Sequence, residues 1–316
     1  MYNRGMAAND RNNPTRAASS HSDYSLIEFI REYPDDAACL DKLWREKHAP
    51  DGHHTPCPKC KRERKFHRIS TRACYACDSC GWQIYPTKGT IFQKSTTSLQ
   101  LWFYAMYLMA STRCGISAKQ LERELGVTYK TAWRIMNKIR NDLMNDEDDG
   151  SLSGDVEIDE TSWGGKPRNK HKTRREAAAF RENKATVLAM VERGGKVRAR
   201  HIASRRGPAL SREVRATVDP SSLIFTDDWV AYRALAREYL GHSVINHSAG
   251  SYVIGDIHTN TVEGFFGNLK TGMRGAYKKV SRKWLQSYLD EYAWRHNAQR
   301  KERPLFDQLL EKAATS

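Results

Sequence analysis

The sequence lacks a long hydrophobic run and an apolar leader. Its most apolar stretch, Leu101 to Ala110, is shorter than the roughly 20 residues that a membrane-spanning helix needs. The first twenty residues, MYNRGMAANDRNNPTRAASS, are polar and do not resemble a secretory signal. We therefore expect a protein that is neither exported nor inserted in a membrane. Residues 1–22 are rich in Asn, Arg and Ser and are expected to form a disordered tail.

Acidic residues are scarce relative to basic ones. The 316 residues include 52 Lys and Arg but only 37 Asp and Glu, which gives a net charge of +15. A surplus of this size attracts polyanions, because neutralising phosphates drives non-specific nucleic-acid binding. A basic protein without such a partner is the alternative, but the charge favours a nucleic acid.

Cysteine is almost confined to one segment, where five of the seven lie between residues 57 and 80 in CxxC pairs. This crowding indicates a metal site in a reducing compartment rather than disulfides. Sixteen residues separate the two best pairs, a spacing typical of zinc sites. The sequence thus predicts one structural Zn²⁺ in a zinc ribbon over residues 55–92, held by Cys57, Cys60, Cys77 and Cys80.

Two points about the ribbon stay open. Cys74 also forms a CxxC pair with Cys77, but we prefer Cys80 as the ligand, because Gly81 suits the turn that closes such a site. The ribbon could be purely structural, yet the many basic residues between the pairs favour contact with DNA. A helical segment over residues 23–54 is expected to precede the ribbon.

A helix-turn-helix is predicted within a helical domain over residues 95–145. In GISAKQLERELGVTYKTAWRIMNKIR, Ser117 and Thr128 can cap two helices, and Gly126 can end the first in a left-handed turn. Its core would contain Leu121, Leu125, Val127, Ala132, Ile135 and Ile139. The exposed start of the second helix would face the major groove with Tyr129, Lys130, Thr131 and Arg134. A helical hairpin used only for packing is the alternative.

After an acidic and Ser/Gly-rich linker over residues 146–154, strands and helices alternate. We expect a strand at VEIDE, a hairpin turning at Arg193–Lys196, and strands at SSLIFTD and HSVIN. Helices are expected over Pro208–Val218, over Trp229–Tyr239 and from about Thr259 onward. This order predicts a mixed α/β domain over residues 155–302, followed by a C-terminal tail over 303–316.

Three acidic residues occupy places where they can meet at one edge of that sheet. Asp159 ends the strand VEID, Asp227 ends SLIFTD, and Glu263 lies at the start of the last long helix. Carboxylates of this kind bind hard divalent cations, and two such ions can assist an in-line phosphoryl displacement. Asn260 and Lys270 share the helical face of Glu263. A lone Asp at a strand end is usually a cap or surface residue. The prediction of a divalent metal site therefore depends on the presence of all three acids in this order.

The chain resembles the bacterial insertion-sequence transposases of the ISXO2-like group, within the DDE, retroviral-integrase-like superfamily. The resemblance runs from about Tyr24 to Asn297. It rests on the ordered motifs CPKC…CDSCG, GTIF, GISAKQLERELGVTYKTAWRIMNKIR, VEIDETSWGGK, FTDDWVAY, HTNTVEGFFGNLKTGMRGAY and YLDEYAWRHN. It implies an α/β, ribonuclease-H-like catalytic core that cleaves transposon ends and joins the 3′-hydroxyl to target DNA.

The resemblance also implies roles for residues. Asp159 and Asp227 match the first two catalytic acids and would hold two Mg²⁺ or Mn²⁺. The family can show Asn where the superfamily has the third acid; we expect Glu263 to be the ligand, and Asn260 to assist or replace it. Lys270 matches a basic residue expected to hold donor DNA.

Further DNA contacts are expected from a basic insertion after Asp159 and from the region after the last acid. The residues concerned are Lys166, Arg168, Lys170, Lys172, Arg174, Arg175, Lys270 and Arg274. A solvated loop is the alternative for the insertion. The expected partners are double-stranded DNA and a second copy of the chain, in the cytoplasm at the nucleoid. A non-catalytic DNA-binding regulator and a nuclease that does not join strands are the rival functions.

Overall fold

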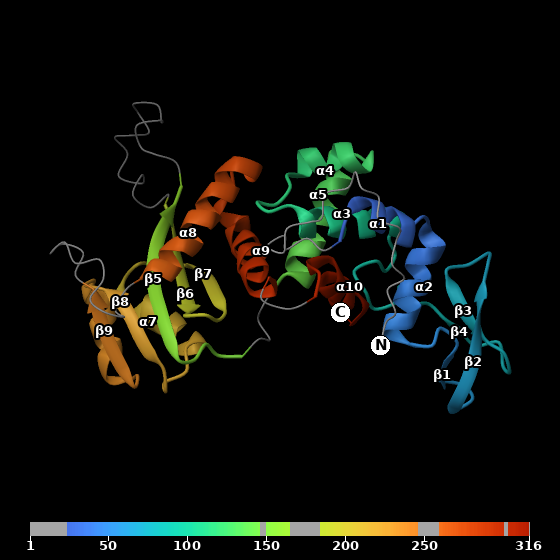
Figure 1. Ribbon diagram of the computed structural model, residues 1–316, viewed down its shortest axis with the longest axis horizontal. Coiled ribbons are helices and arrows are strands. Elements are labelled where there is room, and N and C mark those ends of the chain that lie inside the picture. Colours follow the sequence, from blue (N-terminus) through green and yellow to red (C-terminus); the bar gives the residue numbers. More distant parts are fainter. Residues whose placement is uncertain (1–23, 146–149, 165–183, 246–258, 300–302, 316) are drawn as a thin grey trace, which may run out of the picture.

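The computed structural model describes residues 24–145, 150–164, 184–245, 259–299 and 303–315. Three parts follow one another along the long axis: a small antiparallel sheet, a central group of helices and a mixed sheet with helices on both faces (Figure 1). Within the described ranges, no helix has the length and apolar character that crossing a membrane requires.

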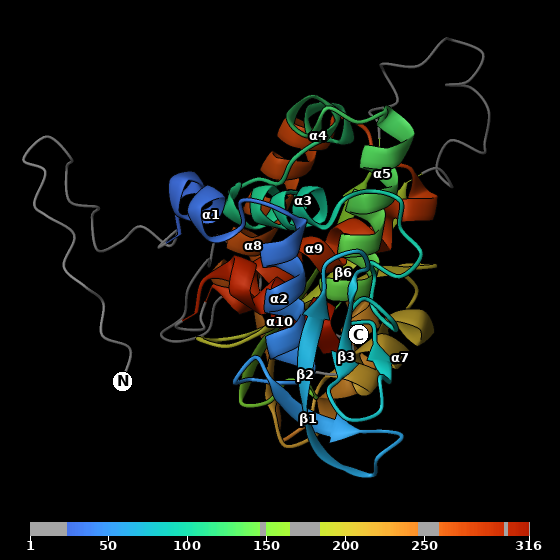
Figure 2. The same ribbon diagram turned by 90° about the vertical axis from the view of Figure 1, so that its right-hand side faces the viewer.

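The N-terminal part packs a helix onto a small sheet. Helices α1 (Leu26–Glu32) and α2 (Asp36–Lys47) begin at the capping side chains of Ser25 and Asp35. The sheet contains β1 (His54–Cys57), β2 (Arg62–Ile69), β3 (Cys74–Cys77) and β4 (Gln83–Ile84), antiparallel and in this order. Trp44 of α2 stacks on Tyr75 of β3 with ring centroids 4.2 Å apart. Figure 1 shows α2 between this sheet and the central helices, and Figure 2 views the molecule from the side of this sheet.

The central part contains two helices and a turn at the positions predicted for the helix-turn-helix. It comprises α3 (Leu99–Ser111), α4 (Ala118–Leu125), α5 (Tyr129–Lys138) and the π-helical turn η1 (Ile139–Leu143). Ser117 and Thr128 cap α4 and α5 as predicted, and Gly126 between them has φ +63°. The apolar residues predicted for its core are buried, except Val127, which is partly buried against the same cluster.

The C-terminal residues belong to this helical part. The segment expected as a tail contains helix α10 (Leu305–Thr315). Phe306, Leu309, Leu310 and Ala313 of α10 are buried in the same apolar cluster as α3 and α5. The segment therefore completes the helical core instead of extending from it, because its apolar residues recur at helical spacing.

The third part is built on a five-stranded mixed sheet. Its strands are β5 (Asp155–Trp163), β6 (Ala185–Glu192), β7 (Val197–Ile202), β8 (Leu223–Asp227) and β9 (Gly241–Ile245). The spatial order is β7-β6-β5-β8-β9, with antiparallel pairs among the first three and parallel pairs from β5 to β9. Each strand lies where the sequence predicted one, although β5 extends beyond VEIDE.

Helices cover both faces of this sheet, because alternate residues of its strands are apolar. On one face lie α7 (Gly207–Thr217) and the 3-10 helix η4 (Val230–Arg237), the latter where an α-helix was expected. On the other lie α8 (Asn260–Gly272), the turns η6 (Met273–Tyr277) and η7 (Arg282–Trp284), and α9 (Leu285–Ala298). Along β6, Val187 and Ala189 face α8 and α9, whereas Leu188 and Met190 face α7.

Candidate active site and metal centre

The first two predicted acids lie side by side on neighbouring strands. In the parallel pair β5–β8, Asp155 is opposite Leu223 and Glu157 is opposite Phe225. The paired residues end at Glu157 and Phe225; Asp159 and Asp227 each lie two residues further along their strands, and the charge of Asp227 acts on Asp159. Both acids lie on the face covered by α8, since they alternate with Ile158 and Ile224, which pack under α7.

The third predicted acid approaches from the helix above that face. Glu263 is an exposed residue in the first turn of α8, and its Oε1 lies 3.4 Å from the Thr259 hydroxyl. Its charge contributes to the electrostatic environment of Asp159, as does that of Asp227. The structure therefore brings the three acids together at one edge of the sheet.

A buried carboxylate, Glu157, fixes α8 over this edge. The N-terminus of α8 has no side-chain cap from its N-cap residue Thr259. Glu157 supplies one from β5 instead, because its Oε2 accepts from the backbone amides of Thr261 at 2.8 Å and Val262 at 3.0 Å. Arg193 donates to the other oxygen at 2.9 Å, which compensates the buried charge.

Sequence reasoning missed Glu157, although it lies in the same VEIDE motif as Asp159. The only signal was its period-two spacing from Asp159, which puts both side chains on one face of β5. An acidic residue on a face that must be covered by a helix has to find a positive partner. Neither the helix N-terminus nor Arg193 could be assigned as that partner without the strand order.

The environment of Asp159 disfavours its ionised form. Burial is the largest cause that raises the pKa of Asp159 from 3.8 to about 6; a hydrogen bond from the Glu160 amide opposes it, and the charges of Glu160, Asp227 and Glu263 add to it. Carboxylates packed this closely need a cation or protons between them. Among the described residues, however, only a cysteine group has three or more metal-type ligand atoms all within 4.8 Å of one another, so the three carboxylates are spaced more widely.

Glu160, the next residue on β5, faces the opposite side of the sheet. Its carboxylate accepts from Arg205 Nη2 at 2.6 Å and from the Tyr232 hydroxyl at 2.6 Å. Arg205 thus neutralises a charge adjacent to Asp159. The sequence did not indicate these contacts, in which Arg205 holds the loop before α7 and Tyr232 holds helix η4 against β5.

The remaining predicted residues of this region lie along α8 and beyond. Asn260 is exposed at the first position of α8, three residues before Glu263. Lys270 lies two turns further, with Nζ 5.4 Å from the centre of the Phe266 ring, and Arg274 is exposed in η6. Residues predicted for the basic insertion lie outside the described residues: Lys166, Arg168, Lys170, Lys172, Arg174 and Arg175.

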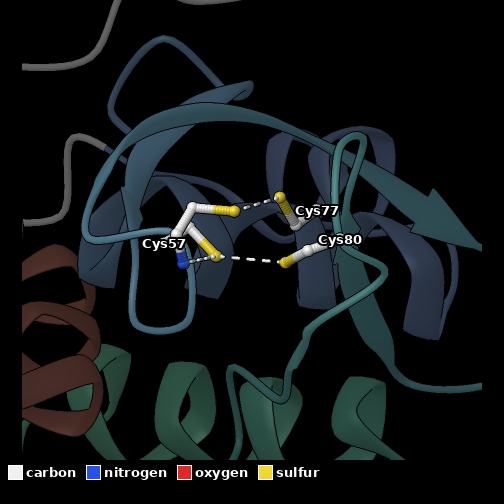
Figure 3. Close-up of side chains that lie close together, drawn as sticks. Cys57, Cys77 and Cys80 are labelled. Carbon is white, nitrogen blue, oxygen red and sulfur yellow. Dashed lines mark hydrogen bonds between the residues drawn. The ribbon is translucent and has the colours of Figure 1, made fainter.

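The four predicted cysteine ligands converge in the small sheet. Cys57 and Cys60 bracket the turn after β1, and Cys77 and Cys80 bracket the turn after β3. The Sγ atoms of Cys57 and Cys80 are 3.6 Å apart, and those of Cys60 and Cys77 are 4.0 Å apart, as the dashed lines in Figure 3 indicate. All four sulfur atoms lie within 4.8 Å of one another.

Cys74 is not part of this group. It is buried, and its Sγ lies 3.8 Å from Gln83 Oε1 on β4. Gly81, which follows Cys80, has φ +69°, the left-handed conformation that the predicted closing turn requires. The cluster therefore has the composition and spacing of a four-thiolate metal site.

The start of α5 presents the side chains expected to face DNA. Tyr129, Lys130 and Arg134 are exposed, and Thr131 is partly buried. The exposed guanidinium of Arg134 also donates to the Thr97 hydroxyl at 3.1 Å, so this contact fixes the position of the side chain. The helix-turn-helix geometry is present, but its use in DNA binding remains a proposal.

Two comparisons with known proteins identify the family of this chain. The family described as the ISXO2-like transposase domain matches residues 151–297, the span that contains all three acids. A protein of Halobacterium salinarum named "Uncharacterized protein in transposable element ISH50" is 30% identical over 265 residues, which is 78% of this chain and 86% of that protein. The chain belongs to the ISXO2-like transposase family. The matched domain begins at Ser151, and the isolated bridge between Leu152 and Val218 attaches its start beside α7.

Proposed function

We propose that this member of the ISXO2-like transposase family cleaves DNA at transposon ends and joins the freed 3′-hydroxyl to target DNA. The observation that carries the proposal is the parallel pairing of β5 and β8, since Asp159 and Asp227 each lie two residues beyond the last pair, on the face covered by α8. The strand order β7-β6-β5-β8-β9, with antiparallel pairs from β7 to β5 and parallel pairs from β5 to β9, supports a ribonuclease-H-like core.

The residues at this edge fit divalent metal ions. Asp159, Asp227 and Glu263 are oxygen donors suited to Mg²⁺ or Mn²⁺, and Asn260 offers an amide oxygen on the same helical face. Two such ions would activate the attacking oxygen and stabilise the leaving one. Bound cations would also stabilise the ionised form of Asp159, whose pKa is raised by burial and, to a smaller extent, by the neighbouring acids.

The chemistry needs no covalent bond between protein and DNA. In the first step water attacks a phosphodiester phosphorus, and the bond to the 3′-oxygen breaks to leave a 3′-hydroxyl. In the second step that hydroxyl attacks a target phosphodiester, which forms one bond and breaks one. Glu157 positions α8 and its Glu263, while Lys270 and Arg274 supply positive charge toward the DNA backbone.

The N-terminal modules would recognise the ends. We propose that the four cysteines bind one structural Zn²⁺, which holds the two turns of the ribbon together. Tyr129, Lys130, Thr131 and Arg134 would enter the major groove. A reaction on two ends favours a dimer or a larger assembly on DNA.

A strand-transfer assay tests this function. Labelled duplexes that carry the inverted repeats flanking the gene are incubated with the full-length protein, Mg²⁺ and a target plasmid. We expect joined product, and we expect Asp227→Asn to abolish it, whereas Asp228→Asn, at the exposed neighbouring carboxylate, keeps it. Comparing Glu263→Gln with Asn260→Ala identifies the third ligand.

The other outcomes of the strand-transfer assay would contradict the proposed function or its metal ligands. Cleavage without joining by the unmodified protein would identify a nuclease, and specific binding without chemistry would identify a regulator. Joined product that survives Asp227→Asn would refute the assignment of the metal ligands.

A further inference from the structure

A cleft of about 650 Å³ opens beside the proposed catalytic edge, on the face of the sheet opposite α8. One wall comes from the loop before α7 and the start of that helix, and the other from the residues that follow β8 and enter η4. The side chains that matter to its chemistry are Arg205, Arg206, Pro208, Trp229, Val230 and Ala231. Strands β5, β7 and β8 run in the same direction, so the loops after them reach this same edge.

The second wall of the cleft is apolar and open to solvent. Trp229 is 44% exposed and Val230 is 66% exposed. Large apolar side chains left exposed together usually mark a contact surface. Trp229 is also tied to the proposed catalytic site, because its backbone amide donates to Asp227 Oδ1 at 3.1 Å.

The first wall supplies positive charge. Arg205 and Arg206 are exposed, and the Arg205 guanidinium lies 5.1 Å from the centre of the Trp229 ring. The same guanidinium is anchored by its 2.6 Å hydrogen bond to Glu160, the residue after Asp159. An exposed indole with arginines beside it matches a nucleotide, since the ring can stack on a base and the guanidinium can bind a phosphate.

We propose that this cleft holds an unpaired nucleotide of the DNA next to the cleaved phosphate, with its base on Trp229 and its phosphate on Arg205 and Arg206. A base within an intact duplex is covered by its neighbours, so only an unpaired or extruded base can reach an aromatic wall of this kind. The inference rests on the proposed function, because that function places DNA at this edge of the sheet.

The test compares two probes that differ only in base pairing. One is a blunt 40-base-pair duplex, and the other is the same duplex with a single-stranded thymidine overhang at one end. Their affinities for the full-length protein are measured by fluorescence anisotropy without added Mg²⁺. We expect Trp229→Ser to weaken binding of the overhang probe about 5- to 150-fold relative to the blunt probe. Trp229→Phe, which keeps a stacking ring, should restore most of that difference.

Trp82 provides a matched control, because it is 45% exposed and lies in the zinc ribbon, far from this cleft along the chain. Trp82→Ser should leave the ratio of the two affinities unchanged. A 5-iodouracil base in the overhang should also crosslink under ultraviolet light to a peptide containing residue 229. A ratio unaffected by Trp229→Ser, or a crosslink to the α8 face only, would overturn the proposal.

The two proposals fail in different ways. If the unmodified protein joins no strands but the affinity ratio depends on Trp229, the proposed function fails and the cleft assignment stands. If it joins strands and the ratio is the same in Trp229→Ser, the cleft assignment alone fails. Thermal melting of each variant checks that the sheet remains folded.

Discussion

Replacing Asp159 by Asn should stabilise the metal-free protein, although it should abolish strand transfer. Ionising Asp159 in the folded chain is unfavourable, because its pKa is raised from 3.8 to about 6, mainly by burial and also by the charges of neighbouring acids. A difference of about 2 pKa units corresponds to about 3 kcal/mol of unfolding free energy. This is an upper value, since Asn imitates the protonated carboxyl only in shape.

The stability gained by Asp159→Asn should depend on pH. The unfolded chain ionises Asp159 near pH 4, whereas the folded chain does so near pH 6. The penalty is therefore absent below about pH 4, grows as the pH rises to about 6, and is constant above that. Urea unfolding without Mg²⁺ should show no difference between Asp159→Asn and the unmodified protein at pH 4 and a gain of about 3 kcal/mol at pH 8.

A control of opposite sign is available in the same domain. The pKa of Asp219 is lowered because its carboxylate accepts hydrogen bonds from the side chain and amide of Ser221. Asp219→Asn should therefore destabilise the protein at pH 8, and the effect should shrink as the pH falls through the lowered pKa. Equal stability of Asp159→Asn and the unmodified protein at pH 8 would refute the reasoning, because it would mean that neither burial nor the neighbouring acids disfavour the ionised Asp159 in the folded chain.

Three further predictions follow from other contacts. Glu157→Gln should lower the unfolding free energy by about 1–3 kcal/mol, since it removes the charge that pairs with Arg193 and weakens the hydrogen bonds to the amides of Thr261 and Val262 at the start of α8. Urea unfolding measures this, and an unchanged unfolding free energy would contradict the capping role. Cys77→Ser should lose the bound zinc, whereas Cys74→Ser should keep it, as metal analysis of the purified proteins would show; equal zinc content in both variants would exclude the four-cysteine site. Lys130→Ala should weaken binding to DNA that contains the transposon ends. If Lys130 binds a phosphate, the slope of log affinity against log salt concentration should also fall by about one. An unchanged slope would show that Lys130 does not bind a phosphate.

The elements that depend on local pattern were predictable from the sequence. Gly126 between two capped helices was enough to place the turn of the helix-turn-helix, because few other residues adopt its left-handed conformation. The strand-end position of Asp227 was also visible, since an apolar run ended there. The strand end expected at Asp159 was wrong, because β5 continues to Trp163 and leaves Asp159 in its middle. What the sequence could not provide was the adjacency of β5 and β8, which are separated by more than fifty residues and by two intervening strands.

Long-range partners explain the other gaps. Glu157 could be recognised as a cap only after α8 had been placed over β5, and Arg205 as the partner of Glu160 only after the loop before α7 had been placed. The C-terminal segment looked like a tail because it follows the last motif of the resemblance. Its apolar side chains have helical spacing, which predicts a helix. That this helix packs into the core around α3 depends on contacts between residues far apart in the sequence.

Helix α9 joins the two larger parts of the molecule through a buried charge cluster. Leu285 and Leu289 at its start pack under the mixed sheet, whereas Trp294 and Ala298 at its end pack into the helical core. Between them the buried Glu291 accepts from Arg140 Nε at 2.9 Å, and Arg140 lies in η1, directly after the proposed recognition helix.

This cluster fixes the orientation of α9 as well as its position. Arg295 and Tyr277 also donate to Glu291, each at 2.8 Å, and Arg295 binds the Thr112 carbonyl at the end of α3. A buried ion pair adds little net stability over an apolar contact, but separating its partners is costly. The cluster therefore resists rotation of α5 relative to α9, so DNA bound at the start of α5 would be held at a defined distance from the acids on β5 and β8.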